Sequence, residues 1–523
     1  MSELLALLPG YLTAHLQLTL LALLLSIGVS VPLGIAATRL VWLEQPSLAL
    51  AGVIQTVPSL ALLAVMVPVL AALDLQSIGF LPAIVGLTLY GVLPVLRNTV
   101  IGIRGVDPAL TEAARGVGMT PRQQLLMVEL PLAMPVVVGG VRTATVWVVG
   151  IATLSTPVGA TSLGNYIFSG LQTRNYASVI VGCIAAAGLA MLLDGLVRAI
   201  EVGLARRRRG RLVAALAAVV LLYGYAGATL AAPLLGDRER PIVIGTKSFT
   251  EQYVLGAVIT GWIEHETSRP TSLLQSLGSL VAFDALDAGE IDVYVDYTGT
   301  LWANEMGRGD VRAGRAETLR GVREFLEVDH GMTLAATLGF ENTYALAVRA
   351  ADAERLDLRT IGDLVPHAPR LAIGADVEFF ARPEWPAVRD TYGLDFREQR
   401  AMDASLMYQA AATNEVDVIS AYTTDGRIAA YDLRVLEDDR GAIPPYDAIL
   451  LAGARLAREA PDVLDALARL GGAIDADRMR ALNLRVDERG EDPGTVGASL
   501  VRELAGRAPA AHRNAPPTRP GAP

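Results

Sequence analysis

The stretch TEAARGVGMTPRQQLLMVELPLAMP, residues 111–135, separates two strongly apolar parts of the chain. It carries four charged residues where neighbouring segments of similar length carry almost none: Glu112, Arg115, Arg122 and Glu129. A helix that lies outside the bilayer must expose polar side chains to water or to a partner, and Glu112 near its start suits the positive end of the helix dipole. Gly118 lets the chain turn sharply and approach another surface closely. The pattern predicts a short helix outside the bilayer at about residues 108–122, between two membrane spans.

Composition divides the chain into two different halves. The 523 residues are 52% hydrophobic, which is high for a soluble protein, and 19% charged, which is high for a purely membrane one. Residues 1–236 hold 13 arginines and 8 acidic residues, a net charge of +5, and the remaining residues carry −15. This predicts a membrane half followed by an acidic, water-soluble half. An acidic surface disfavours nucleic-acid binding, which needs a basic one.

Six apolar segments are long enough to cross a hydrocarbon core, which takes about 20 residues. They are residues 14–38, 48–72, 77–96, 131–154, 177–197 and 212–235. Arginines gather in the odd-numbered loops, including the run at 206–209, so these loops are expected to face the cytoplasm. The N-terminus and everything after about residue 236 are then expected outside the cell membrane.

Several kinds of site are disfavoured by simple counts. The chain has one cysteine, Cys183, and five histidines without metal-ligand spacing, so neither a disulfide framework nor a metal site is expected. The only lysine is Lys247, in VIGTKS, where Thr246 stands in the place of the second glycine of a Walker A loop. The chain is therefore not expected to hold its own ATPase site or a cofactor. The scarcity of nucleophile–base sets also argues against an enzyme.

The acidic half alternates strands and helices. Its first predicted elements are, in order, a strand at 242–245, a helix opening at Thr250, a strand at 272–276, a helix at 279–288 and a strand at 291–297. Such alternation predicts a mostly parallel sheet covered by helices. The pattern restarts near residues 360 and 405, which predicts two α/β units with a cleft between them. The Pro- and Ala-rich tail, 509–523, is expected to be disordered.

The charged stretch that begins at residue 111 also resembles a known motif. Glu112-Ala113-Ala114, Gly118 and Val128-x-Leu130-Pro131 match the pattern EAA-x3-G-x9-I-x-LP of ABC importer permeases, with Val in the place of Ile. The resemblance implies that Glu112, Ala113, Ala114 and Gly118 dock into a groove of a P-loop ATPase and carry its closure into the membrane. Because the chain has no P-loop, that ATPase is a separate subunit, and two copies of the chain are expected to pair with two ATPases.

The acidic half resembles the substrate-binding proteins of glycine betaine/choline-type importers. The resemblance covers most of residues 241–507, through motifs such as DVYVDYTGTLW (292–302), ENTYALAVR (341–349) and IPPYDA (443–448). The whole chain then resembles the fused permease–binding-protein subunits of this family, which import glycine betaine, choline, carnitine or ergothioneine across the bacterial inner membrane. The implied organisation is a type I permease domain with five spans at 1–210, an additional span at 211–236, and an extracytoplasmic two-lobed α/β domain at 237–508.

Ligands of this family carry a trimethylammonium group, which aromatic faces bind through cation–π contacts worth about 0.5–2 kcal/mol each. The resemblance maps the family's cage tyrosines onto four positions: Tyr297, Tyr344, Tyr422 and Tyr446. A tyrosine at a strand end is also an ordinary half-buried core residue. Tyr253, Tyr392, Tyr408 and Tyr431 are assigned to packing.

A ligand carboxylate would need an arginine fork or amide donors. The candidates are Arg382 and Asn342, followed by Lys247 and Ser248 at the start of the first helix of the acidic half, itself an anion site. Arg382 is alternatively half of a structural salt bridge. Glu378 and Asp425 either complement a cationic part of the ligand or cap turns.

Two other classes of function compete with an importer. A membrane-anchored receptor would use the same cleft to signal, but it needs a cytoplasmic output domain, and this chain shows none. An extracytoplasmic enzyme would need a catalytic set that the residues do not supply. ATP-driven uptake of a quaternary ammonium compound is therefore the leading prediction.

Overall fold

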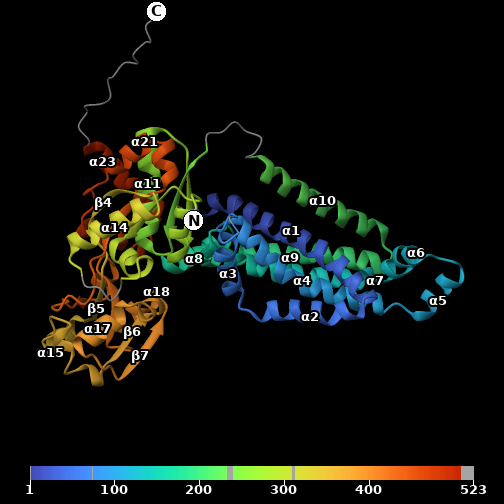
Figure 1. Cartoon of the computed structure of the whole chain (residues 1–523), viewed down its shortest axis with the longest axis horizontal. Helices are drawn as coiled ribbons and strands as arrows, with labels where there is room; N and C mark the ends of the chain where they lie inside the picture. Colours follow the sequence, from blue (N-terminus) through green and yellow to red (C-terminus); the bar gives the residue numbers. More distant parts are fainter. Residues whose placement is uncertain (1, 74, 174, 233–239, 309–312, 508–523) are drawn as a thin grey trace, which may run out of the picture. The chain divides into compact units, whose positions relative to one another are not determined.

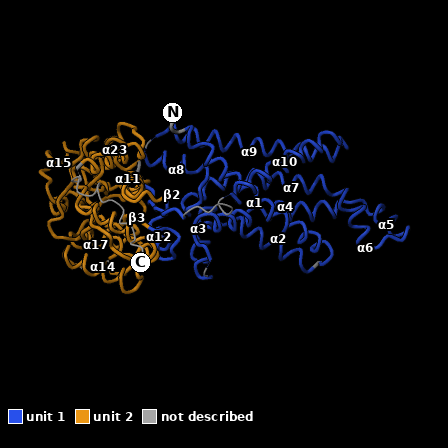
Figure 2. The backbone as a smooth tube through the Cα atoms, turned by 90° about the horizontal axis from the view of Figure 1, so that it is seen from above, with its two compact units in different colours: residues 1–249, 274–292 blue, residues 250–273, 293–523 orange. Residues whose placement is uncertain are grey.

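The computed structural model describes residues 2–73, 75–173, 175–232, 240–308 and 313–507. The chain divides into two compact units, shown in separate colours in Figure 2. Unit 1 comprises Met1–Phe249 with Leu274–Asp292, and unit 2 comprises Thr250–Leu273 with Val293–Pro523. The tail at 509–523 lies outside the described residues.

Long apolar helices make up most of unit 1 (Figure 1). Among the described residues, five helices are long and apolar enough to cross a membrane: α1 (Ser2–Arg39), α4 (Phe80–Arg104), α7 (Leu130–Ala152, with its flanking turns), α9 (Tyr176–Ala205) and α10 (Arg209–Ala231). Helices α1, α4 and α7 pack on one another around Leu18, Leu87 and Val148, which are buried. Two shorter helical segments, η2 (Thr153–Val158) and α8 (Gly164–Gln172), connect α7 to α9.

The predicted span at 48–72 is bent. It is a pair of helices, α2 (Val41–Thr56) and α3 (Ser59–Ala71), bent by 103°. Pro58 lacks a backbone N–H and pushes Val57 into an extended conformation (φ −69°, ψ 130°), which ends α2. The Tyr90 hydroxyl donates a hydrogen bond to the Val57 carbonyl at the break. Counting the pair as one broken span gives six spans, the predicted number.

The predicted docking helix at 108–122 is also divided. Helix α5 (Pro108–Gly116) is capped by Asp107, whose carboxylate accepts from the Ala109 amide at 2.9 Å. A turn through Gly118 (φ +80°) follows the helix. Helix α6 (Pro121–Gln124) then continues through a π-helical turn, η1 (Leu125–Glu129), into α7. We call residues 108–124 the docking segment. Figure 1 shows α5 and α6 together beyond one end of the long helices.

Two five-stranded sheets follow, each with its own helices. The first has the order β2-β1-β3-β10-β4, and the second β7-β6-β8-β5-β9. Strands of the first sheet are β1 (Ile242–Lys247), β2 (Thr271–Leu277), β3 (Val293–Tyr297), β4 (Thr333–Glu341) and β10 (Asp447–Ala452). Strands of the second are β5 (Tyr344–Arg349), β6 (Ala372–Asp376), β7 (Glu398–Met402), β8 (Val418–Tyr422) and β9 (Leu433–Val435).

The sheets are mixed, and the expectation of mostly parallel strands is wrong. Strand β10 runs antiparallel to β3 and β4, and β5 runs antiparallel to β8 and β9. Strand β6 runs parallel to β7 and β8. Local periodicity predicts that a strand exists, but not which distant strand lies beside it.

Helices flank these sheets in the α/β arrangement that the sequence predicted. The principal ones are α11 (Thr250–Thr267), α12 (Ser279–Asp287), α14 (Arg315–Asp329), α17 (Glu384–Tyr392), α18 (Ala404–Ala412), α21 (Pro461–Ala468), α22 (Ala476–Asp487) and α23 (Pro493–Arg507). Helix α11 packs against α21, α22 and α23, and α18 packs on the second sheet. Met407 and Tyr408 of α18 are fully buried in that second core.

The chain passes between the two sheets at neighbouring positions. After β4, residues 341–343 lead directly into β5, and after β8 the backbone lies beside them: the Thr423 amide donates to the Thr343 carbonyl at 3.1 Å. The Thr343 amide donates to the Thr423 hydroxyl at 3.0 Å. We call residues 341–343 and 423–424 the hinge segments.

Candidate ligand-binding site

Three of the four predicted cage tyrosines lie in one aromatic cluster. The ring centroid of Tyr344, the first residue of β5, is 5.0 Å from that of Tyr422, the last residue of β8. The two residues face each other in the antiparallel register. Tyr446 meets Tyr344 edge-on at 5.9 Å, and Phe379 lies 5.1 Å away on another side. Sequence reasoning missed Phe379.

Carboxylates surround this cluster. The Tyr446 hydroxyl donates to Glu384, which is only 2% exposed, and the Tyr422 hydroxyl donates to Asp376 at 3.3 Å. Burial raises the pKa of Asp376, and it also raises the pKa of Tyr344 far above its ordinary value. These tyrosines are therefore neutral, and the acidic surroundings favour a positively charged group on their faces.

Tyr297 enters the site through a different contact. Its hydroxyl donates to Glu251 at 2.5 Å, and the Asn342 side-chain amide donates to the same Glu251 oxygen at 3.1 Å. The other oxygen of Glu251 accepts from Thr424 at 2.5 Å and from Asn483 at 3.3 Å. One buried carboxylate thus holds two predicted site residues, a hinge segment and helix α22.

Glu251 is the main residue of the site that sequence reasoning missed. It lies in the first turn of α11, where an acidic residue commonly faces water, but it is 2% exposed. Burial raises its pKa, whereas the four donated hydrogen bonds lower it. No local pattern marks such a residue, because its partners are brought together only by the fold.

We predict that Glu251→Gln weakens ligand binding roughly tenfold, because an amide cannot accept from all four donors and the donors left unpaired cost about 1–3 kcal/mol each. Titration of the full-length chain measures the effect. Asp438→Asn is the matched control. Asp438 accepts a hydrogen bond of 2.5 Å from the Tyr392 hydroxyl, and neither residue belongs to the aromatic cluster. Equal losses of affinity in the two variants would contradict a specific role for Glu251.

Arg382 is ion-paired within the protein. Its guanidinium donates to Glu378 at 2.6 Å and lies 3.6 Å from Glu384. The same group lies over the ring of Tyr344, 5.7 Å from its centroid. Arg382 thus forms the structural salt bridge that was its alternative role, with Glu378 as its partner, and it places a cation on the central tyrosine.

Two further predicted site residues lie at the end of β1. Lys247 is the buried last residue of β1 in unit 1, and Ser248 follows it, half-buried. Asp425 pairs with Arg427 at 2.5 Å, and Arg427 lies 4.2 Å from the ring centroid of Tyr408. Asp425 Oδ1 also accepts from the Arg427 backbone amide at 2.9 Å, which is the turn-capping role proposed for Asp425. The packing assignment is correct for Tyr253, Tyr392 and Tyr408, which are buried.

Asp487, in α22, and the neighbouring Asp425 predict that the stability of the domain depends on pH. Burial and the neighbouring Asp425 raise the pKa of Asp487 to about 7, although Arg427 opposes the shift. Its folded-state pKa lies above the unfolded value of about 3.9, so its contribution to stability is complete below pH 4 and is lost as pH rises through 7. The unfolding temperature of the wild-type domain should therefore fall between pH 5 and pH 8. We expect the fall to be smaller in Asp487→Asn. An unchanged slope in calorimetry would contradict this prediction.

The four predicted coupling residues lie together on the docking segment. Glu112, Ala113 and Gly118 are exposed, and Ala114 is buried. Val117, beside Gly118, is 76% exposed. A helix that presents a carboxylate and bare apolar side chains is suited to a partner surface.

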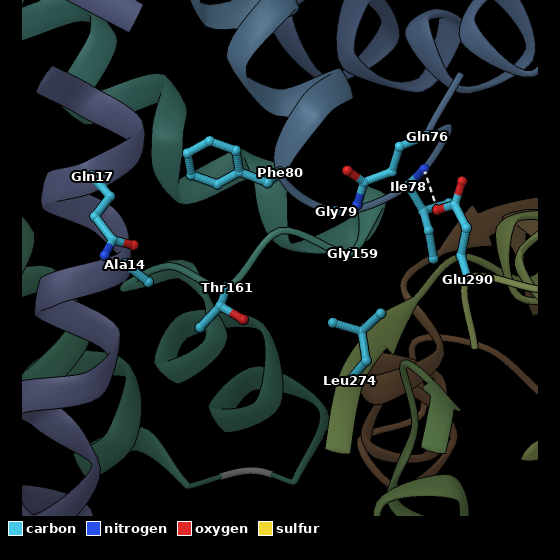
Figure 3. Close-up of a pocket in the computed structure, with 10 residues that line it drawn as sticks. All are labelled: Ala14, Gln17, Gln76, Ile78, Gly79, Phe80, Gly159, Thr161, Leu274 and Glu290. Carbon is cyan, nitrogen blue, oxygen red and sulfur yellow. Dashed lines mark hydrogen bonds between the residues drawn. The ribbon is translucent and has the colours of Figure 1, made fainter. Parts of the chain in front are cut away.

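Unit 1 also holds a cavity of about 360 Å³ (Figure 3). Its lining includes Gln17, Phe80, Thr161, Leu274 and Glu290. Glu290 accepts hydrogen bonds from the amides of Ser77 and Ile78, the latter at 2.8 Å. None of the predicted ligand-binding residues lines this cavity, so the candidate site remains the tyrosine cluster.

Comparison with known proteins assigns both halves. Residues 240–503 match the model of the substrate binding domain of ABC-type glycine betaine transport systems, and residues 30–206 match the binding-protein-dependent transport system inner membrane component. The chain belongs to the ABC-type glycine betaine transporter family. It is a fusion of a permease and a substrate-binding domain, and hence a multi-pass membrane protein. The predicted family and fold class are confirmed.

Individual relatives cover either the whole chain or one half. The ergothioneine transport permease/ergothioneine binding protein EgtU of Helicobacter pylori is 30% identical over 460 residues, which cover 86% of this chain and 82% of EgtU. The choline transport system permease protein OpuBB of Bacillus subtilis is 43% identical over 180 residues, covering 34% of this chain and 80% of OpuBB. A crystal structure of a glycine betaine/carnitine/choline ABC transporter is 31% identical, with a TM-score of 0.46, and covers 50% of this chain and 98% of that one.

Proposed function

We propose that this family member imports a small quaternary ammonium compound, driven by ATP hydrolysis in a separate P-loop ATPase. The observation that carries the ligand class is the aromatic cluster of Tyr344, Tyr422 and Tyr446, with centroids 5.0 and 5.9 Å apart and carboxylates around it. A trimethylammonium group donates no conventional hydrogen bond, so aromatic faces are its natural partners. Relatives whose names specify choline, carnitine and ergothioneine support this class.

Two buried acceptors near the tyrosines narrow the choice of ligand. Asn342 Oδ1 and Glu384 Oε2 have no hydrogen-bond partner among the described residues. A ligand with an O–H or N–H donor would satisfy one of them, and an unpaired buried acceptor costs about 1–3 kcal/mol. Choline, carnitine and ergothioneine carry such a donor, whereas glycine betaine does not.

A ligand carboxylate would add a further contact. We propose that Arg382 and Asn342 receive it, with Lys247 and Ser248 as second candidates. Arg382 already lies over Tyr344, so a carboxylate beside the trimethylammonium group would reach it. Carnitine and ergothioneine combine the carboxylate, the donor and the quaternary ammonium group, and they are the proposed ligands.

We also propose how the importer is assembled in the membrane. Two copies of the chain pair with two ATPases, and the docking segment faces the cytoplasm while the binding domain is extracytoplasmic. The arginine distribution between loops supports this orientation. Tethering the binding domain to its own permease gives it a high effective concentration at the entrance.

Calorimetry on the full-length chain with ergothioneine, carnitine, choline and glycine betaine tests the ligand. We expect carnitine or ergothioneine to bind at least tenfold more tightly than glycine betaine. Preference for glycine betaine would contradict the role of the unpaired acceptors. Uptake of the tightest ligand by cells that express the chain with and without its ATPase distinguishes an importer from a receptor that only binds.

A further inference from the structure

Two buried carboxylates lie at helix ends in unit 1, and each is paired with an arginine from another helix. Glu129, the last residue of η1, is 3% exposed and pairs with Arg39, the last residue of α1. Glu44, in the first turn of α2, is 8% exposed and pairs with Arg104, the last residue of α4. The two pairs are alike in burial and chemistry.

Only the Glu129 pair is connected to the docking segment by the hydrogen bonds of the described residues. While one oxygen of Glu129 accepts from Arg39, the other accepts from the Gln124 side-chain amide at 2.7 Å. Gln124 is 5% exposed, and its own carbonyl oxygen accepts from Arg115 at 3.4 Å. A continuous polar chain thus runs from Arg115 in α5 through Gln124 and Glu129 to Arg39 in α1.

The backbone around Glu129 is suited to relay a movement. It closes a π-helical turn between α6 and α7, and such turns occur frequently at functional sites. Each oxygen of a buried carboxylate needs a partner, so a displaced partner draws the carboxylate with it or leaves it unpaired at high cost. A shift of α5 and α6 would therefore act on the end of α1 through these hydrogen bonds.

We propose that Glu129 is a positioning residue that couples the docking segment to α1. Movement of the docking segment on its ATPase reaches α1 through the Glu129–Arg39 pair, in addition to the backbone connection into α7. This inference rests on the proposed function, since it assumes that the docking segment meets an ATPase. Glu129 occupies a variable position of the EAA pattern, so the pattern itself assigns it no role.

The test compares Glu129→Gln with Glu44→Gln in the full-length chain, reconstituted with its ATPase. Glu129→Gln should reduce the ratio of ATP hydrolysis stimulated by carnitine or ergothioneine, whichever binds more tightly, to basal hydrolysis at least fivefold, with affinity for that compound unchanged within twofold. Glu44→Gln should keep the ratio within twofold of wild type. The exchanged pair Arg39→Glu with Glu129→Arg should recover at least half of the stimulation, which a purely structural defect would not. A normal ratio in Glu129→Gln, an equal loss in Glu44→Gln, or no recovery in the exchanged pair overturns the proposal.

A second measurement needs no ATPase and separates the two proposals. Absence of ligand-stimulated hydrolysis in the wild-type assembly would count against the proposed function. The coupling is then read from amide hydrogen exchange over residues 108–124 in the full-length chain alone. Arg39→Gln should raise exchange there at least threefold, and Glu44→Gln should leave it unchanged. The same exchange in both variants overturns the coupling even if transport is normal.

Discussion

Replacing Tyr344 by alanine is expected to raise the dissociation constant of the ligand at least a hundredfold. Tyr344 is the central ring of the site, with Tyr422, Tyr446 and Phe379 all within 6 Å of its centroid. Truncation removes one aromatic face and the wall that aligns the others, and loss of a buried aromatic side chain costs about 3–5 kcal/mol in packing alone. Calorimetry on the full-length chain measures the change.

Tyr344→Phe is the matched control for this variant. It keeps the ring and removes only the hydroxyl, which accepts from Tyr422 at 3.4 Å, so affinity should change less than threefold. The double variant Tyr297→Ala with Tyr422→Ala should abolish binding as well. Undiminished affinity in either alanine variant, with an unchanged unfolding temperature, would refute the assignment of these tyrosines to the ligand.

Changing the docking segment should stop transport and leave binding intact. We expect Glu112→Lys combined with Gly118→Val to reduce uptake to below about a tenth of wild type. The lysine reverses an exposed charge, and valine is strained at φ +80°, at a cost of about 1–3 kcal/mol, so the turn after α5 must change. Uptake of labelled ligand by intact cells, with calorimetry on the purified variant, measures both properties.

A charge reversal far from the docking segment provides the control. Glu317 is exposed in the first turn of α14 in unit 2, and Glu317→Lys should transport normally. Normal uptake by the Glu112→Lys, Gly118→Val variant would remove the docking assignment. A parallel loss of ligand affinity would instead show that the two halves do not act separately.

Local patterns in the sequence predicted what depends on neighbouring residues. Apolar length located the spans, and the spacing from Glu112 to Pro131 located the docking segment, because both are properties of short stretches of chain. The break at Pro58 was not predicted, since proline is tolerated in membrane helices wherever neighbours satisfy the backbone. Here Pro58 ends one helix and Ser59 begins another at 103°.

Contacts between distant segments were beyond such patterns. Tyr344 and Tyr422 were identified by resemblance, but their pairing depends on the register of β5 against β8. Glu251 and Phe379 were missed for the same reason. One partner of Glu251 lies 232 residues away in the chain, and Phe379, in the short helix Val377–Ala381, packs on Tyr344 of β5. The sequence alone could not show that Arg382 forms an ion pair, because its partners Glu378 and Glu384 are placed beside it by the fold.

The place of β10 has a consequence for how this domain folds. This strand comes late in the chain, after every strand of the second sheet, yet it lies between β3 and β4 of the first. A fragment that ended before residue 447 would leave β3 and β4 without the strand that joins them, so the first sheet is complete only when residues 447–452 are present. Truncation before residue 447 should therefore prevent the first sheet from folding, although every strand of the second sheet is present in such a fragment.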